Sequence, residues 1–105
     1  MTKKKYNKLV RDKIPAIIKE SGSQCKTRTM KSAEIEEYYR LKIQEEMEEL
    51  FENPCPEEMA DLMEVVDSLR KKLELKIEDV IEAKCTKRSD RGGFEKGTIL
   101  VHVEE

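Results

Sequence analysis

Two stretches of apolar residues with helical spacing, separated by Asn53-Pro54, constrain the fold of this chain more than any other feature. The apolar residues of the first stretch lie three or four positions apart: Ile35, Tyr39, Ile43, Met47 and Leu50. The second stretch repeats this spacing: Met59, Leu62, Val65, Val66, Leu69 and Leu73. Such spacing gathers side chains on one face of a helix, and a residue before proline disfavours helical geometry. We therefore predict helices over about 32–52 and 56–73.

A shorter helix is predicted before these two. Asp12 is a suitable N-cap residue, and Pro15 is tolerated in a first helical turn. Gly22 is expected to end this helix, and residues 23–31 read as an exposed connector. Ser32 is then the expected cap of the long helix that follows.

The C-terminal third is predicted to contain one more helix and a strand. No Gly or Pro separates the second stretch from a further helical repeat made of Ile77, Val80, Ile81 and Cys85. We expect a bend at residues 74–76 and a fourth helix that ends before Arg91-Gly92-Gly93. In residues 98–103 the apolar residues Ile99, Val101 and Val103 occupy every second position, a pattern typical of a β-strand. The predicted fold class is all-α for most of the chain: an antiparallel bundle of about four helices with a short C-terminal β-strand.

The composition favours one small domain over residues 1–105 that needs a partner. Charged residues make up 42% of the chain, apolar residues 37%, and there is no Trp. Narrow apolar stripes bury little surface in a domain of this size, so we expect a homodimer or a larger homo-oligomer. Because the sequence has neither a run of 18 apolar residues nor a secretory signal, we expect no membrane partner.

The cysteines and the charge distribution exclude further classes of protein. Cys25, Cys55 and Cys85 are odd in number, widely spaced and without a CxxC pair. This argues against a disulfide framework or a zinc site and favours the reducing cytoplasm. The net charge is −2, and residues 34–64 are strongly acidic between two basic ends. An acidic centre repels polyanions, so we expect no nucleic-acid partner.

Several carboxylates fall where a helix should carry apolar residues. At about 100° per residue, Glu46 lies inside the apolar arc of its helix. Glu49 lies on the edge of that arc and Glu45 a little further round. On the next helix, Glu58 lies inside the apolar face and Asp61 at its border. A solvated face paired with Lys and Arg is the alternative, but such a face gives no reason for Glu46 and Glu58 to lie on apolar arcs.

The carboxylates of the two helices are also expected at matching positions along the helix axes, called heights here. In an antiparallel hairpin about Asn53-Pro54, residues at equal height have numbers that sum to about 107. Glu49 pairs with Glu58 in this way, and Glu46 pairs with Asp61, in two layers about 4.5 Å apart. Carboxylates crowded in this way must hold protons or bind metal. Oxygen ligands on rigid helices favour Mg²⁺, with Mn²⁺ as a substitute.

The same residues form a recognisable pattern. The runs Glu45-Glu46-Met47-Glu48-Glu49 and Glu58-Met59-Ala60-Asp61 resemble the EExxE and ExxD motifs of the all-α nucleoside triphosphate pyrophosphohydrolases, the MazG-like superfamily. Residues 6–15 (YNKLVRDKIP) and 87–94 (KRSDRGGF) resemble one branch, the predicted house-cleaning hydrolases related to phosphoribosyl-ATP pyrophosphohydrolase. Only residues 50–57 separate the two acidic motifs, a shorter connection than in many relatives.

The resemblance implies a Mg²⁺-dependent enzyme. It would cleave a nucleoside triphosphate, a non-standard one in the house-cleaning role, between the α and β phosphates to give monophosphate and pyrophosphate. The implied metal ligands are Glu46, Glu49, Glu58 and Asp61. Glu45, Glu46 and Glu49 are the implied catalytic residues. Glu45 would support the ligands or orient the attacking water.

A triphosphate also needs cationic partners. The candidates are Lys8, Arg11 and Lys13 from the basic N-terminal segment and Lys84, Lys87, Arg88 and Arg91 from the end of the fourth helix. The backbone of Arg91-Gly92-Gly93 is a further candidate as an anion-binding nest. Two other functions stay open: a phosphoribosyl-ATP pyrophosphohydrolase, and a non-catalytic helical module whose acidic face docks a basic partner. No motif in the sequence identifies the preferred base or sugar.

Overall fold

The computed structural model describes residues 3–104, so both ends of the domain predicted over residues 1–105 lie outside the described residues. Within this range the chain forms four α-helices and one 3-10 helix: α1 (Ile14–Glu20), η1 (Ser32–Glu34), α2 (Ile35–Glu52), α3 (Pro56–Lys72) and α4 (Ile77–Arg91). The predicted all-α fold is confirmed for these residues. None of the helices in this part of the chain combines the length and the apolar character needed to cross a membrane.

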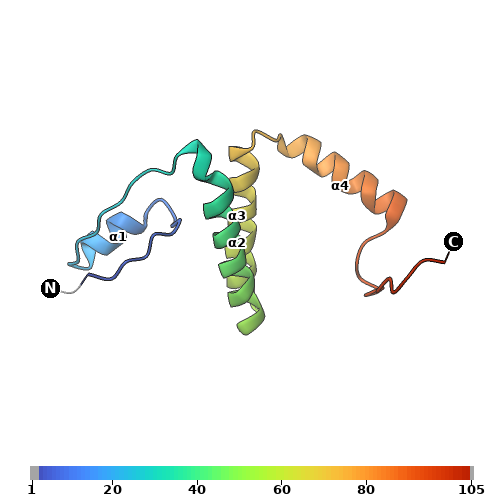
Figure 1. The fold of residues 1–105 in the computed structure, drawn as a ribbon, viewed down its shortest axis with the longest axis horizontal. Helices are drawn as coiled ribbons and strands as arrows, with labels where there is room; N and C mark the ends of the chain where they lie inside the picture. Colours follow the sequence, from blue (N-terminus) through green and yellow to red (C-terminus); the bar gives the residue numbers. More distant parts are fainter. Residues whose placement is uncertain (1–2, 105) are drawn as a thin grey trace.

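Helices α2 and α3 lie side by side and antiparallel, as Figure 1 shows in green and yellow. Asn53 ends α2 outside helical geometry, and Cys55 is extended before Pro56 opens α3. A hydrogen bond of 2.6 Å joins the Tyr39 hydroxyl to the Ser68 Oγ. The numbers of these two residues sum to 107, so the bond lies at equal height on both helices and confirms the predicted register.

The N-terminal helices begin one residue away from the predicted caps. Lys13, not Asp12, is the N-cap of α1 and makes no side-chain cap bond. Ser32 lies inside η1 and does not cap it, because the cap position is Lys31. The Glu34 carboxylate accepts the Lys31 backbone N–H at 2.9 Å instead. This bond is the Glu half of a capping box, in which the carboxylate at N3 accepts the backbone N–H of the cap residue. Both cap predictions were therefore wrong, since the cap residues are Lys13 and Lys31.

Residues 73–76 break α3 from α4, which confirms the bend predicted there. The Leu75 N–H donates to the Arg70 carbonyl at 3.1 Å, and the Glu74 N–H donates to the Lys71 carbonyl at 3.0 Å. This is the Schellman pattern, which needs a left-handed residue after the helix. Glu74 takes that conformation, with φ 58°. A glycine is the usual residue there, so Glu74 holds backbone strain.

Helix α4 leads away from the hairpin (Figure 1) and makes only sparse contacts with the other described elements. Every described residue from Lys71 to Glu104 is exposed. Within one chain, the packed part of the predicted bundle is therefore the α2–α3 hairpin. Residues 98–103 form no strand, so the C-terminal β-strand prediction was wrong. Alternation alone cannot make a strand, since a strand needs a neighbour to bond, and residues 3–104 supply none.

Very little of the described chain is buried. Among these residues only Tyr39, 3% exposed, and Glu46, 6% exposed, are buried. The radius of gyration is 18.5 Å, whereas a compact domain of this length has about 13 Å. One chain therefore holds its site in a narrow hairpin and leaves most of its apolar side chains in contact with solvent.

Candidate metal centre

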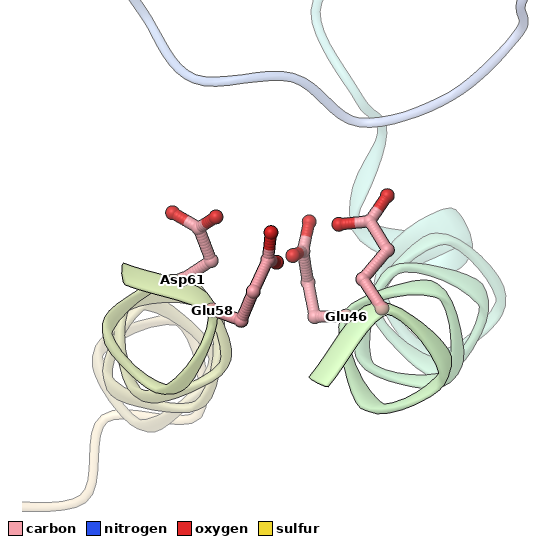
Figure 2. A group of neighbouring side chains, drawn as sticks. Glu46, Glu58 and Asp61 are labelled. Carbon is pink, nitrogen blue, oxygen red and sulfur yellow. The ribbon is translucent and has the colours of Figure 1, made fainter. Parts of the chain in front are cut away.

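Four carboxylates meet between α2 and α3. Glu46 and Glu49 come from α2, and Glu58 and Asp61 come from α3. One oxygen of each lies within 4.8 Å of the others. Figure 2 shows the labelled Glu46, Glu58 and Asp61 side chains reaching from the two helices toward the same side. The convergence predicted from helix geometry is therefore confirmed.

Two oxygens of this cluster are buried without a partner. Glu46 Oε2 and Glu58 Oε2 are shielded from solvent and accept no hydrogen bond from the described residues. Leaving a buried polar group unsatisfied costs about 1–3 kcal/mol, and more for a charged one. The cluster thus has two acceptor atoms that a bound cation would satisfy.

Burial also changes the acidity of Glu46. Loss of hydration raises the pKa of this carboxyl above its ordinary value of 4.5, and the negative charge of Glu49 raises it further. Lys42 opposes the rise, since its Nζ lies 3.3 Å from Glu46 Oε1. A divalent ion would favour the ionised form of Glu46 as a lysine does, but with twice the charge.

Lys42 is a site residue that the sequence analysis did not select. Its Nζ lies between Glu46 and Glu45, 3.5 Å from Glu45 Oε1. Its side chain is only 13% exposed, which is unusual for lysine. The spacing of three and four residues to these glutamates was the available signal, because such pairs face each other on a helix.

Glu45 lies beside the cluster and not within it. Its carboxylate accepts a hydrogen bond of 3.1 Å from Lys8 Nζ and one of 3.5 Å from Lys42. Burial alone would raise the pKa of Glu45, but these two lysines outweigh it and bring the pKa below its ordinary value. Glu45 is therefore poised to stay ionised and to hold cations at the rim, which suits a supporting role for this predicted catalytic residue.

The basic N-terminal segment reaches the same place. Arg11 Nη2 lies 2.7 Å from Asp61 Oδ1, and Lys8 is bonded to Glu45. Figure 2 shows this segment, in faint blue, crossing on the side toward which the carboxylates point. Of the three N-terminal cations predicted to bind phosphate, Lys8 and Arg11 therefore lie at the cluster. Lys13 makes no ion pair within residues 3–104.

The cations predicted on α4 are not brought to the cluster of their own chain. Lys84, Lys87, Arg88 and Arg91 are all exposed on a helix that leads away from the hairpin. Arg88 pairs with Glu95 at 2.8 Å. The predicted nest has one N–H fewer to offer, since the Gly92 N–H donates to the Arg88 carbonyl at 2.9 Å.

Charges of both signs surround the cluster. Glu45 and the four clustered carboxylates carry five negative charges when ionised, and Lys8, Arg11 and Lys42 carry three positive charges. Two negative charges are left over. The donors are all carboxylate oxygens, so the cluster could hold a metal ion.

Comparisons with protein-family models, with curated proteins and with solved structures find no match to this chain. The resemblance to the MazG-like superfamily therefore rests on the motifs themselves.

Proposed function

We propose that this protein is a Mg²⁺-dependent nucleoside triphosphate pyrophosphohydrolase. The observation that carries the proposal is the cluster of Glu46, Glu49, Glu58 and Asp61, in which two buried oxygens have no partner. Lys42 pairs with one oxygen of the buried Glu46 carboxylate, and the other oxygen costs stability unless it also binds a partner. The acidic motifs resemble those of the MazG-like pyrophosphohydrolases, whose substrates would bring such an ion with their phosphates.

The proposed reaction is hydrolysis. Water adds its oxygen to a phosphorus of the α–β bridge, the bridging P–O bond breaks, and monophosphate and pyrophosphate leave. Bound Mg²⁺ would neutralise phosphate charge and make the water more acidic. Glu46, Glu49, Glu58 and Asp61 would hold the ion, while a free carboxylate oxygen of this group would accept the proton of the water. Glu45 would keep Lys8 and Lys42 in place.

We propose further that the functional unit contains at least two copies of the chain. The accessible surface is 10166 Å², whereas a folded monomer of 12.3 kDa exposes about 6,100 Å². The excess of about 4,000 Å² is several times the 800 Å² per partner of an ordinary interface. Exposed apolar side chains on α3, the 73–76 link, α4 and the tail contribute to it, among them Met63, Leu73, Ile81, Phe94, Leu100 and Val101.

A second copy of the chain would also supply cationic side chains to the substrate. The α4 cations Lys84, Lys87, Arg88 and Arg91 lie far from their own cluster, so the proposal assigns them to the phosphate clamp of a neighbouring copy. The substrate is proposed to be a non-standard nucleoside triphosphate, as the house-cleaning branch implies. The protein is proposed to work in the cytoplasm, where its three free cysteines would stay reduced.

The test is pyrophosphate release from a panel of standard and damaged nucleoside triphosphates, with Mg²⁺, Mn²⁺ or chelator present. We expect turnover with either metal and none with chelator. Glu58→Gln should lower the rate by about 100-fold or more, because it removes a metal ligand. Glu48→Gln is the matched control, since Glu48 is exposed on the same helix as Glu46 and, among residues 3–104, bonds only Gln44.

The competing functions give different results in the same assay. With phosphoribosyl-ATP added to the panel, its selective turnover would replace the proposed substrate with that nucleotide. Absence of turnover on every nucleotide by folded protein, with Glu58→Gln indistinguishable from wild type in metal binding, would overturn the proposal and favour an acidic docking module.

A further inference from the structure

The N-terminal segment from Lys8 to Arg11 joins the two helices of the metal centre from outside. Lys8 Nζ bonds Glu45 of α2 at 3.1 Å, and Arg11 Nη2 bonds Asp61 of α3 at 2.7 Å. Between them, Leu9 and Val10 are half-buried. Asn7 has φ 46° and turns the chain just before Lys8, a conformation that Asn tolerates better than most residues. Residues Lys8 to Arg11, called the strap below, are therefore packed against both helices.

The ion pair between Arg11 and Asp61 conflicts with the proposed metal site. Asp61 is one of the four clustered carboxylates, so Arg11 and a divalent ion would compete for its charge. The Arg11 side chain is 56% exposed and that of Asp61 40% exposed, and exposed pairs of this kind contribute little to stability. Arg11 can therefore leave Asp61 at small cost when a cation arrives.

A released Arg11 would lie at the mouth of the site. Its guanidinium is a planar fork that binds two oxygens of one phosphate, a geometry that lysine lacks. Glu46, which is more than nine-tenths buried and has an unpartnered oxygen, marks where the ion would lie below it. A pyrophosphate group held at the cluster would have further oxygens available to the strap, which crosses on the side toward which the carboxylates point (Figure 2).

We propose that the Lys8–Arg11 strap is a phosphate-binding element, in which Arg11 exchanges its ion pair with Asp61 for a phosphate oxygen when the cluster holds a divalent ion. The ligand class is a pyrophosphate group, free or within a nucleotide. This inference rests on the proposed metal site and adds the residue that links metal binding to phosphate binding.

The test measures two affinities by calorimetry on the full chain, that for Mn²⁺ alone and that for inorganic pyrophosphate on Mn²⁺-loaded protein. Arg11→Ala should bind Mn²⁺ about threefold tighter or more, because a competing positive charge is gone. It should bind pyrophosphate about tenfold more weakly, because a charged hydrogen bond is lost. A role for Arg11 in holding Asp61 in place would weaken both affinities, so the opposite signs are diagnostic.

Two variants serve as controls. Arg11→Lys keeps the charge without the fork, so its Mn²⁺ affinity should match wild type and its pyrophosphate affinity should be intermediate. Arg40→Ala removes an arginine whose ion-pair partner among the described residues is Glu36, on the surface of α2, and neither affinity should change. Circular dichroism and thermal melting of each variant verify that the hairpin is folded.

The possible failures are distinguishable. If wild type binds Mn²⁺ and releases pyrophosphate from nucleotides while Arg11→Ala keeps wild-type pyrophosphate affinity, the strap proposal is overturned and the proposed function stands. Weaker Mn²⁺ binding by Arg11→Ala also overturns it. If folded wild type binds no Mn²⁺, both proposals fail together.

Discussion

The α2–α3 hairpin and the C-terminal third use charged residues in opposite ways. In the hairpin, four carboxylates crowd within 4.8 Å and one of them is buried. From Lys71 to Glu104, every described residue is exposed, and ion pairs such as Arg88–Glu95 lie in solvent. Charged groups in the hairpin therefore lose hydration at a cost in stability, whereas those of the C-terminal third stay hydrated.

Apolar residues show the reverse contrast. The hairpin half-buries Ile43, Leu50, Leu62 and Val65 between its helices. The C-terminal third leaves Ile81, Ile99 and Leu100 at least half exposed. The hairpin thus packs part of its apolar surface but exposes residues such as Phe51 and Met63, and it holds the acidic cluster. Helix α4 and the described part of the tail leave all of their apolar residues exposed within one chain. A metal ion would complete the first region, and a second copy of the chain would complete the other.

The largest effect is expected from a substitution that disrupts the proposed interface between copies. Ile81→Glu would bury a charge without a partner between copies, so the oligomer should dissociate and lose at least about 3 kcal/mol of stability. Light scattering gives the mass, and urea unfolding at several protein concentrations gives the free energy. Thr86→Glu puts the same side chain on another face of α4 and should change neither. A wild type that is monomeric at all concentrations would contradict this prediction.

The next largest effect is the stabilisation by Mg²⁺, compared between variants of one acidic residue from each region. Mg²⁺ at 100 times its dissociation constant should raise the free energy of unfolding by about 2.7 kcal/mol through linkage. Glu49→Gln should abolish most of this gain, whereas Glu82→Gln on α4 should keep it. Thermal unfolding with and without Mg²⁺ measures both. Equal gains in the two variants would show that the ion binds elsewhere.

Metal-free protein should show opposite pH effects at two glutamates. The pKa of Glu46 is raised above 4.5 in the folded state, so the folded protein binds this proton more tightly than the unfolded chain. The stability that this proton contributes is fully present below pH 4.5 and is lost as pH rises through the higher pKa. Glu46→Gln in chelator should therefore be more stable than wild type at pH 7, and the advantage should disappear below pH 4.5.

Glu34 provides the contrasting case. A hydrogen bond from Arg28 lowers the pKa of Glu34 to about 2, so its contribution is present above pH 4.5 and is lost as pH falls toward 2. Glu34→Gln should be less stable than wild type at pH 7 and equal to it near pH 2. Denaturant unfolding across pH 2–8 checks both variants. A shared sign at pH 7 would contradict the assigned environments.

The smallest effect concerns the junction between the two regions. Glu74 has φ 58° where glycine carries no penalty. Glu74→Gly should stabilise the protein by about 1 kcal/mol, measured by urea unfolding. Glu78→Gly in the first turn of α4 should destabilise it instead. Destabilisation by Glu74→Gly would mean that this side chain makes a contact worth more than the strain.

Sequence predicted the hairpin well because helix geometry is local and fixed. A rotation of about 100° and a rise of 1.5 Å per residue, with one stop at Asn53-Pro54, were enough to pair Glu46 with Asp61. The Tyr39–Ser68 hydrogen bond shows the same register. The spacing of Lys42 to its glutamates was also readable, but a lysine at such spacing usually faces solvent.

The rest could not be predicted because it depends on partners outside the pattern. Alternation in residues 98–103 specifies a face but not a neighbouring strand. The direction of α4 depends on the short link at 73–76, where a non-glycine residue takes a left-handed conformation. Nothing in the local sequence shows that Lys8 and Arg11, and not Lys13, reach the acidic cluster, since that contact spans 50 residues from Arg11 to Asp61.

The most direct test of the central claim is anomalous diffraction from crystals of the protein soaked in Mn²⁺. The claim predicts an anomalous peak between α2 and α3, with oxygens of Glu46, Glu49, Glu58 and Asp61 at about 2.0–2.2 Å, by analogy with Mg²⁺. A well-folded hairpin with full Mn²⁺ exposure and no peak among these four carboxylates would contradict it.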